Sequence, residues 1–381
     1  MIKVGFVYFE KIYIVPHFIG SFAELYKDPN VKAEILAPDI DHTYLYEALK
    51  LYDIPKSAVK ILPTYLYKRI AYKIQKRKIP TNRYVFKKHQ KEILDYDVLA
   101  FGVFSHVYVK RKNRNKPKFV FLMHGAGDSD YPFTDEYKPL VNEFNLITTS
   151  GQKINDLFAQ NGPYPNTKFK ICGYQKLDFV KKVQKNKKLF NNDKPIVLYI
   201  PHFRDNLTSF FKFGLDILEF FYQNKEYNLI FAPHMNLFNA TSKRPLDRNI
   251  IDQKYHDAEN ILIDFGSSNS VDMTYTYNAD IYLGDVSSQV YEFLLQGPKP
   301  AIFLNAHNFD WQNNVHFQNW QLGKVIDNID HLKEILDTRD QWLKEYAEKQ
   351  KKAIAYSFDI DPNKSASKRV AEAIKELALS R

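Results

Sequence analysis

Short apolar runs alternate with amphipathic segments along most of the chain. Each run is rich in Val, Ile, Leu and Phe, and the segment after it carries apolar residues at helical spacing. This alternation is typical of parallel sheets whose strands are joined by helices. In the first half of the chain the expected strands cover residues 3–9, 31–37, 58–62, 97–102, 118–123 and 145–149, and the expected helices cover 16–26, 43–52 and 152–160.

The alternation pauses between residues 181 and 194, where Lys and Asn replace apolar residues. Such a stretch is typical of a linker. We therefore expect an N-terminal α/β domain over 1–180 and a C-terminal α/β domain over 195–381. In the second domain the expected strands cover 196–200, 228–232, 261–264, 281–283 and 301–304, and the expected helices cover 207–222, 331–336, 339–355 and 365–379, with one more starting at Gln289.

Composition narrows the class of protein and of partner. A chain of 381 residues with 45% hydrophobic residues can form two cores. Its net charge of +10 favours an anionic partner, such as a nucleotide-activated donor, an anionic polymer, a membrane lipid or a nucleic acid. No nucleic-acid-binding module is visible, so we expect no nucleic acid partner. The single cysteine, Cys172, excludes an intramolecular disulfide and a cysteine-rich zinc site.

No apolar run reaches the ~20 residues that a membrane span needs, and residues 1–9 are too short for a secretory signal peptide. We expect a cytoplasmic protein, either free or peripheral on the inner face of the cell membrane. Residues 65–78 interleave Tyr, Leu and Ile with Lys and Arg, a pattern that suits anionic lipid when it forms a helix. A polymer-binding face and an ordinary surface helix with its apolar side in the core are the alternatives. The basic stretch 110–116 is expected to be a solvated loop.

Two of the expected strands end in histidine. His124 follows the run 119–123 and precedes Gly125, and His234 follows the run 229–232 and a proline. Imidazole titrates near neutrality and suits a general base. We expect His124 to deprotonate an acceptor hydroxyl and His234 to contact the donor's phosphate. Either histidine could instead be a structural residue held by hydrogen bonds, and the sequence leaves the two roles exchangeable.

A third strand leads into a polar turn, Gly-Asp-Val-Ser-Ser, that opens a helix. A helix N-terminus offers unpaired N–H groups and a positive dipole end, which favour phosphate. We expect Ser287 and Ser288 to bind phosphate, Asp285 to hold or orient the ligand, and Glu292 to be a further candidate contact. The same residues could simply cap the helix.

The strand 196–200 is followed by two more candidates for the donor site, His202 and Arg204. A guanidinium can hold a diphosphate in a bidentate manner. The alternative for Arg204 is an ion pair with its neighbour Asp205.

The loop after His124 holds Asp128 and Asp130, an Asp-x-Asp pattern that some glycosyltransferases use for a divalent metal. The pattern also occurs at 39–41, 95–97 and 359–361, so it carries little information. We expect no metal and no cofactor, and we place Gly125, Asp128 and Asp130 on the acceptor side.

Five elements occur in one order along the chain: His124-Gly125, Gly173-Tyr174 with Asp178, the strand end with Arg204, Pro233-His234, and Asp285 with Ser287-Ser288. In these elements the chain resembles the CDP-glycerol glycerophosphotransferases, bacterial enzymes of teichoic-acid and capsule-polymer synthesis. The similarity spans residues 119–305. His202-Phe203 stands where that family usually has Thr-Trp, and Met235 stands where it often has Pro.

The resemblance implies a GT-B-like fold, in which two Rossmann-like domains with parallel sheets face a central cleft and the terminal helix often crosses back to the first domain. The implied reaction moves glycerol phosphate, or a similar polyol phosphate, from a CDP-activated donor to a hydroxyl of a bacterial cell-surface polymer and releases CMP. The N-terminal domain would bind the polysaccharide or lipid-linked acceptor, and the C-terminal domain the nucleotide donor. Two other functions stay open: a nucleotide-sugar-dependent glycosyltransferase for capsule or lipopolysaccharide, and a non-catalytic polymer- or membrane-binding protein of the same fold.

Overall fold

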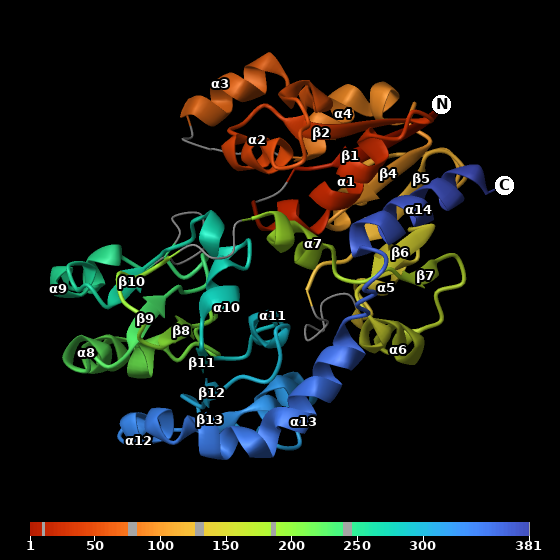
Figure 1. The fold of residues 1–381 in the computed structure, drawn as a ribbon. Helices are drawn as coiled ribbons and strands as arrows, with labels where there is room; N and C mark the ends of the chain where they lie inside the picture. The colour runs from red at the N-terminus through yellow and green to blue at the C-terminus, as the bar shows by residue number, and fades with distance from the viewer. Residues whose placement is uncertain (10–11, 75–81, 126–132, 184–187, 239–245, 381) are drawn as a thin grey trace. The chain divides into compact units, whose positions relative to one another are not determined.

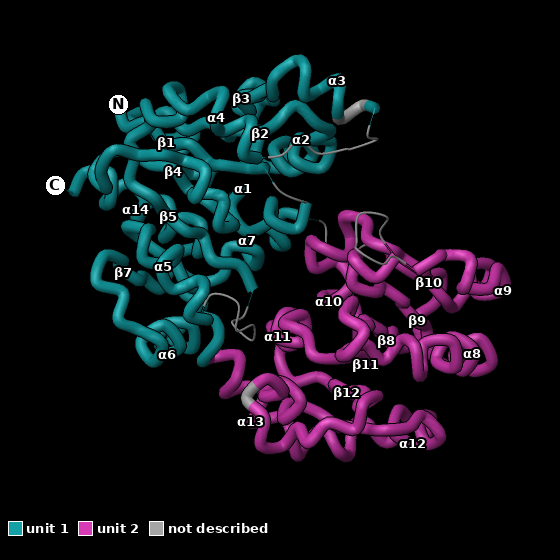
Figure 2. Tube along the Cα trace, turned by 180° about the vertical axis from the view of Figure 1, so that it is seen from behind, with its two compact units in different colours: residues 1–126, 130–183, 356–381 teal, residues 127–129, 184–355 magenta. Residues whose placement is uncertain are grey.

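The computed structural model describes residues 1–9, 12–74, 82–125, 133–183, 188–238 and 246–380 (Figure 1). These residues form two compact units. Unit 1 contains the described residues up to Val183 and from Tyr356 onward, and unit 2 contains those from 188 to Ala355 (Figure 2). The chain returns to unit 1 after it completes unit 2, so unit 2 ends at Ala355 rather than at residue 381.

Unit 1 is built on a sheet of seven parallel strands in the order β3-β2-β1-β4-β5-β6-β7. The strand order changes direction between β1 and β4, and open parallel sheets bind ligands at the carboxyl ends of the strands beside such a point. The strands are β1 (Ile2–Val7), β2 (Val31–Pro38), β3 (Val59–Leu62), β4 (Val98–Phe101), β5 (Lys118–Leu122), β6 (Leu146–Thr149) and β7 (Lys168–Ile171).

Helices pack on both faces of this sheet, because alternate side chains of a strand point to opposite faces. Phe6 of β1 lies in one core with Phe22 of α1 (Ile19–Tyr26) and Ile374 of α14 (Ala366–Leu379), whereas Val7 lies in the other core with Phe86 of α4 (Asn82–Ile93). The other helices of unit 1 are η1 (Ile12–His17), α2 (Thr43–Lys50), η2 (Lys56–Ala58), α3 (Leu66–Ile74), η3 (Phe104–Tyr108), α5 (Lys138–Val141), α6 (Gln152–Asn161) and α7 (Gln175–Lys182).

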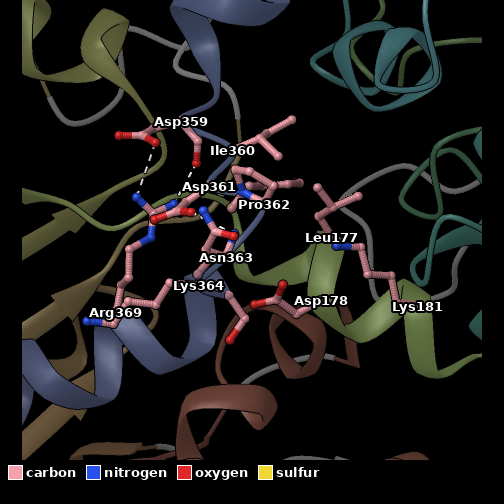
Figure 3. A pocket seen from close by; sticks show the side chains of 13 residues that line it. Leu177, Asp178, Lys181, Asp359, Ile360, Asp361, Pro362, Asn363, Lys364 and Arg369 are labelled. Carbon is pink, nitrogen blue, oxygen red and sulfur yellow. Dashed lines mark hydrogen bonds and ion pairs between the residues drawn. The ribbon is translucent and has the colours of Figure 1, made fainter.

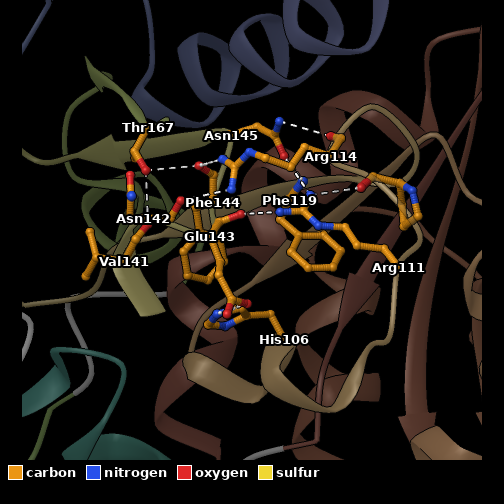
Figure 4. A network of polar contacts seen from close by, with 11 residues as sticks. His106, Arg111, Arg114, Phe119, Val141, Asn142, Glu143, Phe144, Asn145 and Thr167 are labelled. Carbon is orange, nitrogen blue, oxygen red and sulfur yellow. Dashed lines mark hydrogen bonds and ion pairs between the residues drawn. The ribbon is translucent and has the colours of Figure 1, made fainter. Parts of the chain in front are cut away.

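The stretch 110–116, between η3 and β5, sends two arginines into a network of polar contacts (Figure 4). Arg111 donates a hydrogen bond to the side chain of Asn145 at 2.9 Å, and Arg114 donates to the carbonyl of Phe144 at 2.8 Å. The interpretation of this stretch as a solvated loop is therefore wrong for the two arginines, whose hydrogen bonds tie it to the segment that enters β6.

Unit 2 is built on six parallel strands in the order β10-β9-β8-β11-β12-β13, and its strand order changes direction between β8 and β11. The strands are β8 (Ile196–Ile200), β9 (Asn228–Phe231), β10 (Ile261–Ile263), β11 (Ile281–Gly284), β12 (Ala301–Leu304) and β13 (Lys324–Ile326). The helices are the π-helix η5 (Phe210–Gly214), α8 (Leu215–Gln223), η6 (Arg248–Ile250), α9 (Gln253–His256), η7 (Ser268–Ser270), α10 (Thr274–Asn278), α11 (Gln289–Leu294), η8 (Val315–Leu322), α12 (Leu332–Asp337) and α13 (Arg339–Ser357), whose end reaches into unit 1.

The two parallel sheets confirm the expected α/β class, and most elements lie where the apolar pattern placed them. The helix expected at 16–26 is divided into η1 and α1, and the helix expected at 207–222 opens with the π-helical turn η5. The apolar pattern does not predict two edge strands, β7 and β13, because they are short and begin with lysine. Within the described residues no helix is long and apolar enough to cross a membrane.

Candidate active site

His124 lies two residues beyond the end of β5 in unit 1. Its ring centre is 5.8 Å from that of His17 and 6.1 Å from that of Tyr13, and both of these residues belong to η1, which follows β1. Gly125 has a φ of 82°, a left-handed conformation that glycine adopts without strain. Two histidines thus meet beyond the carboxyl ends of β1 and β5, the strands that flank β4.

The surroundings of these two histidines favour their neutral forms. Burial lowers the pKa of His124, a hydrogen bond with the backbone of Gly102 acts in the opposite direction, and the charge of Lys176 lowers the pKa further. The pKa of His17 lies well below its ordinary value through burial first, and then through Lys176 and His124. Nδ1 of His124 is buried and has no hydrogen-bond partner among the described residues, so none of them competes for a proton there.

The element Gly173–Asp178 joins this histidine pair to the last segment of the chain. The side chain of Gln175, the first residue of α7, donates a hydrogen bond to the carbonyl of His17 at 2.7 Å. The carboxylate of Asp178 accepts one from the backbone N–H of Ser367, at the start of α14, at 2.7 Å. The element therefore holds the terminal helix and also brings α7 to η1.

A cavity of about 140 Å³ lies between α7 and the segment that leads into α14 (Figure 3). Arg369 donates hydrogen bonds to the carboxylate of Asp359 at 3.1 Å and to its carbonyl at 2.6 Å. Gly173, with a φ of 85°, packs against this pair, and a methyl group there would lie 2.6 Å from the Asp359 carbonyl oxygen. None of the described residues expected to bind substrate lines this cavity.

Two acceptor-side candidates, Asp128 and Asp130, lie outside the described residues. In the part of the chain that the structure describes, no group of three or more His, Cys, Asp or Glu side chains is placed to hold a metal ion. The acceptor-side candidates within the described residues are therefore His124 and Gly125.

In unit 2 the carboxylate of Asp285 holds the loop that follows β8. Its Oδ2 accepts hydrogen bonds from the backbone N–H groups of His202 at 2.7 Å and Ser209 at 2.9 Å. The residue is fully buried, and this burial raises the pKa of its carboxyl to about 7 in spite of the two hydrogen bonds. Oδ1 is also buried and has no partner among the described residues. One oxygen thus fixes the loop, while the other makes no hydrogen bond within the described part of the chain.

Three rings pack together beyond the ends of β8 and β9. The ring centre of His234 lies 4.4 Å from that of Phe203 and 6.1 Å from that of His202. Burial, with the charges of His234 and Arg204, lowers the pKa of His202 to about 3. Arg204 is exposed, its guanidinium lies 5.8 Å from the Phe203 ring centre, and it makes no ion pair with Asp205. Its charge is therefore not neutralised by the neighbouring carboxylate.

The turn between β11 and α11 places both of its serines at the helix N-terminus. The Oγ of Ser287 accepts a hydrogen bond from the N–H of Gln289 at 3.2 Å, and its carbonyl accepts one from the side chain of Asn319 at 3.2 Å. Ser288 occupies the N-cap position, but its side chain makes no capping hydrogen bond. Glu292 is buried within α11. Ser287 is therefore the serine that caps the helix.

The donor-side candidates come together in unit 2, where they follow β8, β9 and β11, three adjacent strands of one sheet. Sequence reasoning missed four polar residues of these surroundings: His17, Lys176, Ser209 and Asn319. His17 lies in an aromatic run, and the sequence pattern does not place the end of a strand there. Lys176 could have been noticed through its place inside the Gly173–Asp178 element.

Two Rossmann-like units, each with polar residues at the carboxyl ends of parallel strands, define the class of GT-B-like proteins. The wall teichoic acid polymerase TagF matches over 99% of this chain and 88% of its own, at 15% identity and a TM-score of 0.65. S. aureus MnaA matches over 98% of this chain and 96% of its own, at 13% identity and a TM-score of 0.61. The UDP-GlcNAc 2-epimerase from Neisseria meningitidis matches over 98% and 99%, at 14% identity and a TM-score of 0.59. Identities this low establish only that the chain shares its fold with these proteins.

The chain belongs to the CDP-glycerol:poly(glycerophosphate) glycerophosphotransferase family, whose family model matches residues 127–376. A comparison with curated proteins finds no match. Family membership confirms the prediction drawn from the five sequence elements. The protein is therefore a transferase of the class that moves glycerol phosphate from CDP-glycerol to poly(glycerophosphate).

Proposed function

We propose that an acceptor hydroxyl attacks the donor directly, with His124 as its general base. A neutral imidazole with a buried Nδ1 that no described residue occupies is the observation that carries this proposal. His124 takes the proton of the acceptor hydroxyl, and the hydroxyl oxygen bonds to the phosphorus next to the glycerol. The bond between that phosphorus and the oxygen of CMP breaks, and CMP leaves with the electron pair. The product is a new phosphodiester.

The donor's two phosphates are bound in unit 2 under this proposal. Arg204 is exposed and not neutralised by its neighbour, and the turn at Ser287 and Ser288 offers hydroxyl and N–H donors. His234 adds an imidazole that can neutralise charge on the departing phosphate. Asp285 suits a hydroxyl of the ligand better than a phosphate, because a carboxylate repels an anion and a carboxyl with a pKa of about 7 can donate or accept a hydrogen bond.

Product analysis tests this proposal. The purified protein is incubated with CDP-glycerol, CDP-ribitol or UDP-glucose and a soluble acceptor, and the products are separated by mass. We expect CMP and a phosphodiester-linked product from CDP-glycerol. A glycosidic bond with release of UDP would make the protein a glycosyltransferase. Binding of donors without any turnover would make it a non-catalytic member of the fold.

We also propose that α3 attaches the protein to anionic lipid, which would bring it to a lipid-linked acceptor. Leu66, Ile70 and Ile74 lie four residues apart on this helix and are 71%, 56% and 77% exposed. The alternative that this apolar stripe packs in the core is therefore wrong for these three residues. An exposed apolar stripe among lysines and arginines is typical of a helix that lies on a membrane surface.

Vesicle co-sedimentation tests this attachment. Vesicles with anionic lipid should bind the protein, vesicles of neutral lipid should not, and binding should weaken as salt rises. Replacing the three α3 residues together with Ser should abolish binding. A matched triple variant, with Ser at the exposed and separate positions Leu215, Ile250 and Ile360, should keep it. Equal binding by both triple variants would refute the role of α3.

A further inference from the structure

The side chain of His202 takes no part in the reaction as proposed above, yet its ring is held in one orientation. Its Nδ1 accepts a hydrogen bond from the backbone N–H of Arg204 at 3.0 Å. The ring stacks on that of Phe203, with the two centres 4.7 Å apart and the planes at 24°. The backbone N–H of His202 donates to the carboxylate of Asp285 at 2.7 Å. These contacts fix both the backbone and the ring plane of His202.

The contact with Arg204 also decides which ring nitrogen of His202 carries the proton. A backbone N–H can only donate, so Nδ1 must keep its lone pair and the proton of the neutral ring must lie on Nε2. A protonated ring would direct a second N–H at the N–H of Arg204, so the contact opposes the charged form. Burial, with the charges of His234 and Arg204, acts in the same direction and lowers the pKa of His202 to about 3. His202 therefore presents a neutral N–H donor at Nε2.

This N–H group is not used within the described part of the chain. No described residue hydrogen-bonds to Nε2 of His202, and this nitrogen is not among the buried atoms that lack a partner, so it reaches the surface. His234, which follows the adjacent strand β9, has the same arrangement, because its Nδ1 accepts a hydrogen bond from the backbone N–H of Asn236 at 3.2 Å. The two ring centres lie 6.1 Å apart. Two neutral rings with the proton on Nε2 thus lie side by side at the ends of β8 and β9.

We propose that His202 donates its Nε2–H to a phosphate oxygen of the CDP-activated donor, beside the contact made by His234. The inference rests on the proposed function, in which unit 2 binds the donor's phosphates. A hydrogen bond to a charged oxygen is stronger than one between neutral groups, and a donor that is already fixed needs no reorganisation to form it. A neutral imidazole can polarise a substrate oxygen without carrying a charge of its own. His202 thereby holds the diphosphate through a contact that does not depend on its own protonation.

Two substitutions separate the N–H donor of this ring from its acceptor. The side-chain amide of Asn can take the place of Nδ1 and keep the contact with Arg204, whereas that of Gln can take the place of Nε2 and keep the N–H. The measurement is calorimetry with CDP on the full chain, and the control is His331→Asn, at a histidine whose side chain is 76% exposed. We expect His202→Asn to bind CDP about 10-fold or more weakly than the wild type, and His202→Gln and the control to bind it within about 3-fold.

The possible results separate this inference from the proposed function. Wild-type affinity for CDP in His202→Asn, or equal losses in His202→Asn and His202→Gln, would mean that the ring only shapes its loop and would overturn the inference alone. Failure of the wild type to bind CDP would contradict the proposed donor site and the inference with it. The expected differences in CDP affinity without any transfer from CDP-glycerol would contradict the proposed reaction and leave the contact standing.

The pH dependence of the same affinities is an independent check. The titratable and charged groups that face His202 are His234, Arg204 and the carboxylate of Asp285, and all three are present in both the wild type and His202→Asn. Their titration, and that of CDP itself, therefore cancels in the ratio of the two affinities. We expect this ratio to stay constant from about pH 5.5 to about pH 8, because a neutral donor keeps its proton. A ratio that grows as pH falls would show that His202 binds CDP as an imidazolium and would overturn the neutral donor.

Discussion

Burial decides which of the candidate site residues carry charge. It lowers the pKa of His124 and brings that of His202 to about 3, so both imidazoles are neutral at neutral pH. The neutral form is the one that can accept a proton, as a base must. Burial raises the pKa of Asp285 to about 7, so this carboxyl changes its charge near neutral pH. A phosphate bound nearby would raise that pKa further and favour the protonated form.

Replacing Asp285 with Asn should change how stability depends on pH. The folded-state pKa is raised from 3.8 to about 7, so between these values the folded protein binds more protons than the unfolded chain. Stability therefore falls as pH rises through this window. Relative to Asp285→Asn, the wild type should lose about 2–4 kcal/mol of unfolding free energy between pH 4 and pH 8.

Denaturant titrations at several pH values measure this difference. The depressed pKa of His202 has the opposite effect, because it costs stability as pH falls below 6.5, but both proteins share that residue and its contribution largely cancels. A difference between the two proteins that stays constant from pH 4 to pH 8 would show that Asp285 is charged throughout the range.

At the scale of elements, the apolar pattern predicts the strands and helices whose bounds depend on the local sequence alone. The strands expected at 196–200 and 301–304 are β8 and β12 to the residue. Each is a continuous apolar run that starts directly after a proline, and it ends before Pro201 in β8 and before the polar Asn305 in β12. The contacts that build the site, by contrast, join residues that lie far apart in the sequence. Asp285 accepts a hydrogen bond from Ser209, 76 positions earlier, and no periodicity reports such a pair. The sequence accordingly predicted Asp285 as a candidate but missed its hold on the β8 loop.

The turn before α11 can be tested by replacing Ser287 and Ser288 with Ala together. The loss of the Ser287 capping bond should cost about 1 kcal/mol of unfolding free energy. Binding of CDP-glycerol should weaken about 10-fold or more, because hydrogen bonds to a phosphate would be lost as well. Thermal unfolding with and without donor measures both effects. Unchanged donor affinity with only a lower melting temperature would show that the turn caps the helix and does not bind the donor.

The Gly173–Asp178 element can be tested by replacing Gly173 with Ala. Its φ of 85° strains any other residue, and the added methyl group would meet Arg369 and the Asp359 carbonyl. Gly297→Ala is the matched control, because Gly297 has a φ of 121° but open space around it. The control should lose about 1–3 kcal/mol of unfolding free energy from backbone strain alone, and Gly173→Ala clearly more. Equal losses in denaturant titrations would mean that the terminal segment does not depend on this contact.

At the scale of the whole molecule, the chain builds one unit, then the other, and then returns. The last helix, α14, shares a core with α1 and β1 of unit 1, although more than 300 positions separate Phe22 from Val370 in the sequence. The apolar spacing of 365–379 predicts a helix but not its partner, since an apolar face fits many surfaces. The family resemblance implied that the terminal helix crosses back, and the structure shows one contact that holds it there, the hydrogen bond that the backbone N–H of Ser367 donates to Asp178. The five short elements predicted the family because they occur in a fixed order and come from both units.

Acceptor-dependent release of CMP from CDP-glycerol, compared between the wild type and His124→Gln, tests the central claim most directly. Glutamine keeps a hydrogen-bonding side chain but cannot take the acceptor's proton, so turnover should fall by ~10²–10⁴ while the unfolding midpoint stays close to that of the wild type. His331→Gln, at a histidine whose side chain is 76% exposed, is the control and should keep full turnover. A folded His124→Gln protein with nearly normal turnover would contradict the account.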